Sequence, residues 1–271
     1  MLQACLNGDR SKDFNAAVPC TPAELARDAA AARRAGAVEL HFHPRDAAGR
    51  ETVAPEEVAD AVSAVRRAVP GLPLGLSTHW QIAPGGRARQ AALAAWSDRP
   101  ELRPDYVSVN LVEADAPEIV ALMLSRGIGV EAGLWSLADA ERFLALPTAG
   151  ACLRVLIEIN EQEVSEGLAV ARAILGALDQ AGSRLPRLLH GLNAGKWPLY
   201  REALALGLDR RVGFEDGGRL PDGAPAPDNA ALVSAAAALE RAFGQGTAGN
   251  RRAASAAAGA GAEEEERQFP R

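Results

Sequence analysis

Two histidines separated by one position, His41 and His43, are the residues in this sequence with the clearest chemical potential. Side chains two positions apart on a strand point to the same side, so the two imidazoles would converge if that side faces inward. Two histidines from one strand and a carboxylate from another form a common catalytic zinc set that leaves coordination positions open. The chain has only four histidines, and the placement of two in this spacing favours a metal site over a chance pairing.

An acidic pair, Glu215 and Asp216, offers the missing carboxylate. Glu215 could serve as the third ligand, which would leave Asp216 for proton chemistry. Without the histidines, a solvated strand end would be the better interpretation of this pair. Arg211 precedes Glu215 by four residues and could bind a substrate carboxylate through its planar guanidinium. Arg45 could do the same, but a surface ion pair is the better interpretation of that residue.

These side chains must be positioned by regular elements, and the sequence alternates eight short apolar runs with longer amphipathic stretches. Thr21 before Pro22 and Ser136 are good N-caps for helices, whereas Ala54 precedes a proline and acids without offering a capping side chain. Such alternation predicts a parallel sheet with crossover helices. Eight units favour a closed (β/α)8 TIM barrel of the α/β class over an open doubly wound sheet, and no Gly-x-Gly-x-x-Gly supports a dinucleotide site. The predicted strands are Leu2–Leu6, Val38–His43, Leu74–Ser77, Tyr106–Val109, Gly129–Ala132, Cys152–Glu158, Arg187–His190 and Val212–Glu215.

A barrel of this kind carries its functional residues at the C-terminal ends of its strands. Polar residues gather at these ends of the predicted strands, although loop residues are polar in any case. His79 remains open between a further metal ligand, a base, a substrate contact and no role, and the same holds for His190. The substrate-binding residues expected from these positions are Asp9, Thr78, His79, Ser108, Asn110 and Glu131.

The composition fits one catalytic domain, predicted over residues 1–244, with 48% apolar residues to build its core. A net charge of −6 and the lack of a Lys/Arg stripe argue against nucleic acid and anionic membranes as partners. No apolar run reaches the ~18–20 residues of a membrane helix. We find no signal peptide at the start and too few cysteines for a disulfide framework, so a cytoplasmic location is expected. Residues 245–271 are rich in Gly, Ala, Ser, Arg and Glu and are predicted to form a disordered tail rather than a docked helix.

Taken together, these motifs resemble the β-keto acid cleavage enzymes, a family whose founding activity is the cleavage of 3-keto-5-aminohexanoate. The resemblance covers nearly the whole predicted barrel and leaves only the tail outside. The histidine pair combined with Gly-Phe-Glu-Asp is its specific part, and the other stretches support it. The matching stretches are Ala4–Gly8, His41–Arg45, Gly49–Arg50, Leu76–Thr78, Ser108–Asn110, Arg211–Asp216 and Asp228–Asn229.

The resemblance implies a zinc-dependent (β/α)8 enzyme that exchanges the acetyl group of acetyl-CoA with a β-keto acid, giving acetoacetate and a new acyl-CoA. A Lewis-acidic metal would polarise the keto oxygen and stabilise enolate-like charge as the carbon–carbon bond breaks. The family also suggests a homo-oligomer. The residues implied are His41, His43 and Glu215 as zinc ligands, Asp216 as the acid/base residue oriented by Arg211, and Ser77 and Asn110 as contacts to the substrate or intermediate.

Three positions depart from the family pattern. Asp9 stands where the family usually has glutamate, and it is one methylene shorter. His79 and Trp80 replace a pair of glycines and add bulk near the site. The glycine-rich loop expected after the sixth strand is absent, and the stretch Glu158–Glu163 replaces it with three acids, which would repel the phosphates of CoA if they faced the site.

Three functions therefore stay in view. The first is a zinc-dependent β-keto acid cleavage enzyme that uses acetyl-CoA. The second is a zinc hydrolase or lyase that uses metal-bound water and no CoA. The third is a non-catalytic barrel that binds a metal and a metabolite, against which the presence of a candidate base and an arginine argues.

Overall fold

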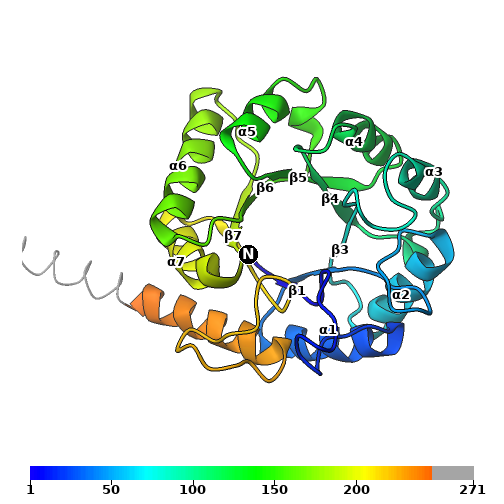
Figure 1. Ribbon diagram of the computed structural model, residues 1–271, viewed down its shortest axis with the longest axis horizontal. Helices are drawn as coiled ribbons and strands as arrows, with labels where there is room; N and C mark the ends of the chain where they lie inside the picture. Colours follow the sequence, from blue (N-terminus) through cyan, green and yellow to red (C-terminus); the bar gives the residue numbers. More distant parts are fainter. Residues whose placement is uncertain (246–271) are drawn as a thin grey trace, which may run out of the picture.

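Eight parallel strands pair in the order of the chain, and β8 pairs with β1 to close a barrel (Figure 1). The computed structural model describes residues 1–245 of the 271. The (β/α)8 barrel predicted from the alternation is confirmed, and the predicted tail lies outside the described residues apart from residue 245. The strands are β1 Leu2–Cys5, β2 Glu39–Phe42, β3 Leu74–Ser77, β4 Tyr106–Asn110, β5 Gly129–Leu134, β6 Arg154–Ile159, β7 Arg187–Gly191 and β8 Asp209–Val212.

Helices surround the barrel and cover the outer faces of its strands (Figure 1). The helical stretch 229–245 lies between α7 and α1, where the hydroxyl of Tyr200 donates to Glu240. No helix within residues 1–245 is long and apolar enough to cross a membrane. The other helices are α1 Pro22–Ala35, α2 Pro55–Ala68, α3 Ala88–Ala94, α4 Ala116–Ser125, α5 Leu137–Leu144, α6 Val164–Gln180 and α7 Lys196–Leu206, and the 3-10 turns are η1 Pro100–Leu102, η2 Ala149–Ala151 and η3 Asn193–Gly195.

The helix starts follow the capping chemistry of the sequence. At α1 the hydroxyl of Thr21 accepts a hydrogen bond from the backbone N–H of Glu24, whose carboxylate accepts one from the N–H of Thr21. Ser136 accepts a bond from the N–H of Asp139 at the start of α5. Ala54 makes no side-chain cap before α2. Each side-chain cap stabilises the fold by about 1 kcal/mol.

The eighth strand begins earlier than the sequence suggested, because its first residues are polar. The prediction of a strand over Val212–Glu215 is wrong: β8 spans Asp209–Val212 and pairs with β7 from Asp209 onward. A Cβ at Gly213 would lie 1.8 Å from the carbonyl oxygen of Cys5, so only glycine allows the chain to pass β1 this closely. Glu215 therefore lies in the turn after the strand.

A buried polar layer fills the barrel below its C-terminal mouth. The Nε of Arg154 donates to Glu131 at 2.6 Å, and the amide of Gln3 donates to the hydroxyl of Tyr106 at 2.9 Å. A Cβ at Gly75 would lie 2.1 Å from the Tyr106 ring, so a glycine is required there. Buried charges destabilise a fold unless they are paired, and here Arg154 and Glu131 form an ion pair. The layer supports the residues above it at the mouth of the barrel.

Candidate active site

The structure brings His41 and His43 together at the mouth of the barrel. His41 lies near the end of β2 and His43 directly follows the strand, so both side chains point inward. Their Nε2 atoms are 3.2 Å apart. Asn7 at the end of β1 fixes the backbone here, because its side chain accepts from the N–H of His43 and donates to the carbonyl of His43.

Glu215 completes a set of three possible metal ligands. Its carboxylate oxygens lie 3.8 Å from Nε2 of His41 and 3.7 Å from Nε2 of His43. One ligand atom from each residue lies within 4.8 Å of the other two. Ligands at zinc distances of about 2.0–2.1 Å in tetrahedral geometry stand about 3.3 Å apart. The donors therefore fit zinc or a similar cation and leave a position open. A Cβ at Gly8 would lie 2.4 Å from Cγ of Glu215, so glycine is needed beside this carboxylate.

Glu51 supports His43 from behind. Its carboxylate accepts a hydrogen bond from Nδ1 of His43, which leaves Nε2 directed at His41 and Glu215. A carboxylate in this position fixes the orientation and tautomer of a ligating histidine. Glu51 was not predicted from the sequence. The available signal was an acid eight residues after the histidine motif, on the loop that leaves the same strand.

Arg45 forms no ion pair with the residues that the structure describes, in contrast to the surface ion pair that the sequence favoured. Its guanidinium donates to the backbone carbonyls of Gly8, Arg10 and Gly49. A guanidinium whose donors are used by backbone oxygens is held in the loop and ties the turn after β1 to the turn after β2. Arg45 is therefore part of the support under the metal ligands.

Burial and neighbouring charges shift the pKa values of the candidate ligands. Burial lowers the pKa of His41 to about 3, which keeps its imidazole neutral as a metal ligand requires. Burial also acts to lower the pKa of His43, but Glu215 and Glu51 outweigh it and raise that pKa to about 9. Burial favours the protonated form of Glu215, yet Arg211 and the two histidines hold its pKa well below the usual range. A metal at this place would displace a proton from His43.

Arg211 joins the two acidic residues that follow β8. Its Nη2 donates to Glu215 at 2.6 Å and to Asp216 at 2.9 Å, and its Nε donates to Asp216 at 3.1 Å. Burial alone would raise the pKa of Asp216, but the guanidinium and the nearby His190 lower it below its usual value. Asp216 is thus an ionised carboxylate, as a base must be.

Two further buried side chains surround the carboxylate of Asp216. The thiol of Cys5 on β1 donates to Oδ2 of Asp216 at 2.9 Å. Burial and the adjacent Asp216 raise the pKa of Cys5 well above its usual value, so the group stays a thiol donor. His190 lies between two acids, with Nδ1 3.3 Å from Asp216 and Nε2 3.5 Å from Glu158. His190 is buried, does not line the active-site cavity, and is not part of the possible metal-ligand set found within residues 1–245.

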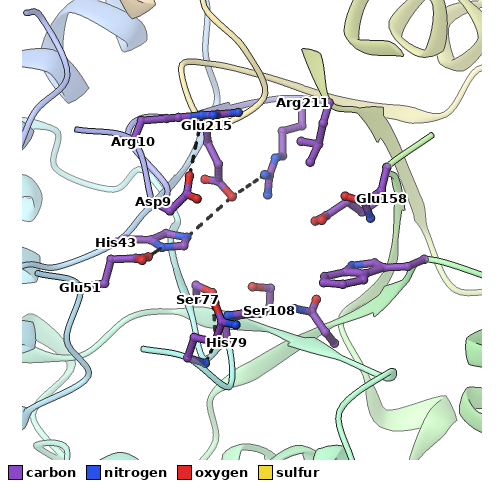
Figure 2. A pocket seen from close by; sticks show the side chains of 15 residues that line it. Asp9, Arg10, His43, Glu51, Ser77, His79, Ser108, Glu158, Arg211 and Glu215 are labelled. Carbon is purple, nitrogen blue, oxygen red and sulfur yellow. Dashed lines mark hydrogen bonds and ion pairs between the residues drawn. The ribbon is translucent and has the colours of Figure 1, made fainter. Parts of the chain in front are cut away.

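An open cavity of about 250 Å³ lies above these residues. Figure 2 shows Arg10, Glu215 and Arg211 on one side of it, Ser77, Ser108 and His79 on the opposite side, and Glu158 at one end. Eight of the predicted site residues line this cavity. They are Asp9, His43, Ser77, His79, Ser108, Asn110, Arg211 and Glu215.

Four predicted site residues do not line the cavity. His41 is buried behind its partner ligands, and Asp216 lies behind Arg211 with no exposed surface. Thr78 is fully buried, and its hydroxyl donates to the backbone carbonyl of Ser108. Glu131 belongs to the polar layer below the site. We therefore place Thr78 and Glu131 in the structural support of the site.

Two of the residues that line the cavity form an aromatic pair. The rings of His79 and Trp135 stack with centroids 6.3 Å apart and an interplanar angle of 18°. Of the three tryptophans Trp80, Trp135 and Trp197, Trp135 lines the cavity. The other two lie elsewhere: the Trp80 ring packs against the guanidinium of Arg89, and Trp197 donates to the carbonyl of Arg219.

The chain is similar to known enzymes over most of its length. The chain is 29% identical to the 3-oxoadipate:acetyl-CoA acetyltransferase of Cupriavidus necator over 245 residues, which is 87% of this chain and 86% of the relative. It is 24% identical to the 3-keto-5-aminohexanoate cleavage enzyme of Acetoanaerobium sticklandii over 253 residues, or 89% of this chain and 91% of that one.

The fold is shared with the solved apo structure of ObcA, with a TM-score of 0.63 and 20% sequence identity. This likeness covers 84% of the chain, which spans 62% of the ObcA chain. The profile of the family described as beta-keto acid cleavage enzyme matches residues 1–256. The match covers the described barrel from end to end, including every candidate ligand. The chain is an enzyme that belongs to the β-keto acid cleavage enzyme family.

Proposed function

We propose that this enzyme uses a divalent metal, zinc in the first instance, to transfer acyl groups between a β-keto acid and acetyl-CoA. The bond between the α and β carbons of the keto acid breaks, and its acyl group moves to the sulfur of CoA. The acetyl group of acetyl-CoA joins the α carbon that carries the carboxylate. The products are one acetoacetate and one new acyl-CoA for each acetyl-CoA consumed.

The observation that carries this proposal is the convergence of His41, His43 and Glu215 beside the cavity. A metal held there would act as a Lewis acid on the keto oxygen. Two of the three donors reach the cavity directly, so a substrate oxygen can approach the open position from above.

The protein's own side chains supply binding and proton transfer. Arg211 lines the cavity with a guanidinium suited to a carboxylate, and Ser77 offers a neutral hydrogen-bonding group from the opposite wall (Figure 2). Asn110, which also lines the cavity, offers another. We assign the acid/base role to Asp216. Because its carboxylate lies directly behind Arg211, displacement of that guanidinium toward the substrate is part of the assignment.

The relatives support the use of acetyl-CoA. One is named for acetyl transfer between 3-oxoadipate and acetyl-CoA and another for cleavage of a keto acid that bears an amine. Both match more than four-fifths of this chain. We extend the thioester chemistry to this enzyme on that basis.

We also propose a cytoplasmic homo-oligomer. Cys5 and Cys152 are buried free thiols, and Cys20 is also free, which suits a reducing compartment. Native mass spectrometry of the purified protein gives the subunit number directly. A strictly monomeric mass at micromolar concentration would contradict the second half of this proposal.

The direct test is a panel of β-keto acids, including 3-oxoadipate and 3-keto-5-aminohexanoate, with metal-loaded enzyme and acetyl-CoA. We expect acetoacetate and a new acyl-CoA to form in equal amounts with at least one of them. A rate that does not change when acetyl-CoA is omitted would favour the hydrolase or lyase alternative. Metal and ligand binding without any turnover would favour the non-catalytic alternative.

A further inference from the structure

A second cavity, of about 460 Å³, lies beside the active site at the same end of the barrel. It is built from the segments that follow β1, β7 and β8. Loops after the seventh and eighth strands are a frequent place for phosphate groups in barrels of this type. The residues that line this cavity are Phe14, Asn15, Asn193, Ala194, Gly217, Gly218, Arg219 and Pro225.

The cavity depends on two glycines. A Cβ at Gly218 would lie 2.9 Å from the ring of Phe14, and one at Gly217 would lie 3.3 Å from the backbone of Asn193. Gly217 also has a φ of +139°, a conformation that side chains with a Cβ rarely adopt. Larger residues at these positions would fill the space or push its walls apart.

The segment Gly217–Arg219 lines this cavity and is held in place by side chains of α7. The ammonium of Lys196 donates to the carbonyls of Gly217 and Arg219, and the indole of Trp197 also donates to Arg219. These bonds hold the carbonyl oxygens on the α7 side. Within residues 1–245, the backbone N–H groups of Gly218 and Arg219 donate to no protein acceptor. A backbone N–H without a protein acceptor can donate to an anion.

Positive charge is available at the same place. The guanidinium of Arg219 is exposed, and its only hydrogen bond to the described residues goes to the carbonyl of Gly223. Arg10 lies between the two cavities: it lines the first one, packs over the Phe14 ring at 4.7 Å and donates to Asn193 at 3.2 Å. A ligand that extends from the metal site over Arg10 would therefore enter the second cavity.

The opposite side of the site has the reverse charge. Glu158 lies near the end of β6, Glu161 and Glu163 follow the strand, and no basic residue occurs from there to Val164. Glu158 lines the active-site cavity itself. Phosphates are repelled by these acids and attracted toward Arg219 and toward Arg10, which also lies 3.8 Å from Asp9. A polyanionic ligand is therefore favoured on the β8 side over the β6 side.

We propose that the second cavity binds the phosphate-bearing end of the CoA thioester, with its diphosphate on Arg219 and the N–H groups of residues 218 and 219. This inference rests on the proposed use of acetyl-CoA. In the family pattern a glycine-rich segment after β6 would supply this binding. In this chain we assign it to the loops after β7 and β8. The thioester carbon then reaches the metal site past Arg10.

The test is calorimetric titration of CoA and of pantetheine, which lacks the phosphates, into the wild type and Arg219→Glu. We expect CoA affinity to fall about tenfold or more in the variant, as for loss of a charge-assisted contact to phosphate. Pantetheine affinity is expected to stay within a factor of two, on the order of experimental scatter. Arg34→Glu, on the exposed last turn of α1, makes the same charge change and should bind CoA like the wild type.

A second variant tests the shape of the cavity. Gly218→Ala places a methyl group against Phe14 and should also weaken CoA binding without a change in charge. The inference is overturned if Arg219→Glu binds CoA as the wild type does, or if pantetheine binds the wild type as tightly as CoA. Turnover plays no part in these titrations. A protein that bound CoA here but formed no acetoacetate would disprove the proposed function and leave this phosphate site standing.

Discussion

The Nε2 atoms of His41 and His43 face each other at 3.2 Å, and the carboxylate of Glu215 lies within 3.8 Å of both. Two imidazole nitrogens gain little from this proximity unless they share a proton or a cation. The low pKa of His41 keeps one ring neutral, and its Nδ1 has no hydrogen-bond partner in the described part of the chain. The arrangement suits the metal-ligand set that we propose, and variants of the neighbouring side chains can test this proposal.

Glu51 is expected to strengthen metal binding through His43. Replacement by alanine leaves Nδ1 of His43 without its acceptor, so the ring can rotate and its basicity falls. We expect the metal affinity of Glu51→Ala to drop about 10–100-fold, measured by competition with a chromophoric chelator. Glu51→Gln keeps an acceptor oxygen and should lose less. An alanine variant with wild-type affinity would show that this hydrogen bond does not support the site.

Matched amide variants of Asp216 and Glu158, the two carboxylates near the cavity, should have different effects on kcat and KM. Asp216→Asn removes the proposed acid/base group while preserving its shape, and kcat should fall by at least about 100-fold. Glu158→Gln alters charge at the end of the cavity and should act mainly on KM for the β-keto acid. Steady-state kinetics with acetyl-CoA saturating decides between them. A greater loss of kcat in the Glu158 variant would move the acid/base role to that residue.

Asp28 should make the protein less stable as pH rises. Burial, only partly offset by the hydrogen bond from Asn229, raises the pKa of Asp28 to about 7. The folded state therefore holds this proton more tightly than the unfolded state does between about pH 4 and 7. Its stabilising effect is complete at the acid end of that window and is lost as pH passes 7.

Asp28→Asn removes this dependence, since its amide oxygen can still accept from Asn229. The variant should exceed the wild type in free energy of unfolding by about 1–3 kcal/mol at pH 8 and by much less at pH 4. Urea denaturation at the two pH values gives this difference. Equal differences at both pH values would show that Asp28 titrates normally in the folded protein.

Local signals were enough to predict the barrel. Thr21 and Ser136 cap their helices as the sequence indicated, and alternation located eight strands. The start of β8 was misplaced because Asp209, Arg210 and Arg211 carry charges that are satisfied by distant partners, such as the N-terminal amine at Asp209. A search for apolar runs cannot detect a strand whose side chains pair across the fold.

The candidate site was only partly visible in the sequence. The spacing of His41 and His43 determines which way they point, so their convergence could be anticipated. The depth of a side chain within the barrel could not be anticipated. The stagger between neighbouring strands decides whether an inward-pointing residue reaches the mouth. Glu131 and Asp216 illustrate this: one lies in the polar layer and the other behind Arg211. Glu51 was not predicted, because its role depends on how the loop after β2 folds back against that strand.

The measurement that tests the metal site most directly is elemental analysis of protein purified without added metal. Wild type and His79→Ala, which changes a histidine on the opposite wall, should each contain close to one zinc or similar ion per chain. His41→Ala, His43→Ala and Glu215→Ala should lose it while circular dichroism shows an intact fold. Full metal occupancy in any of these three variants, or none in the wild type after exposure to zinc, would contradict the assignment of His41, His43 and Glu215 as metal ligands.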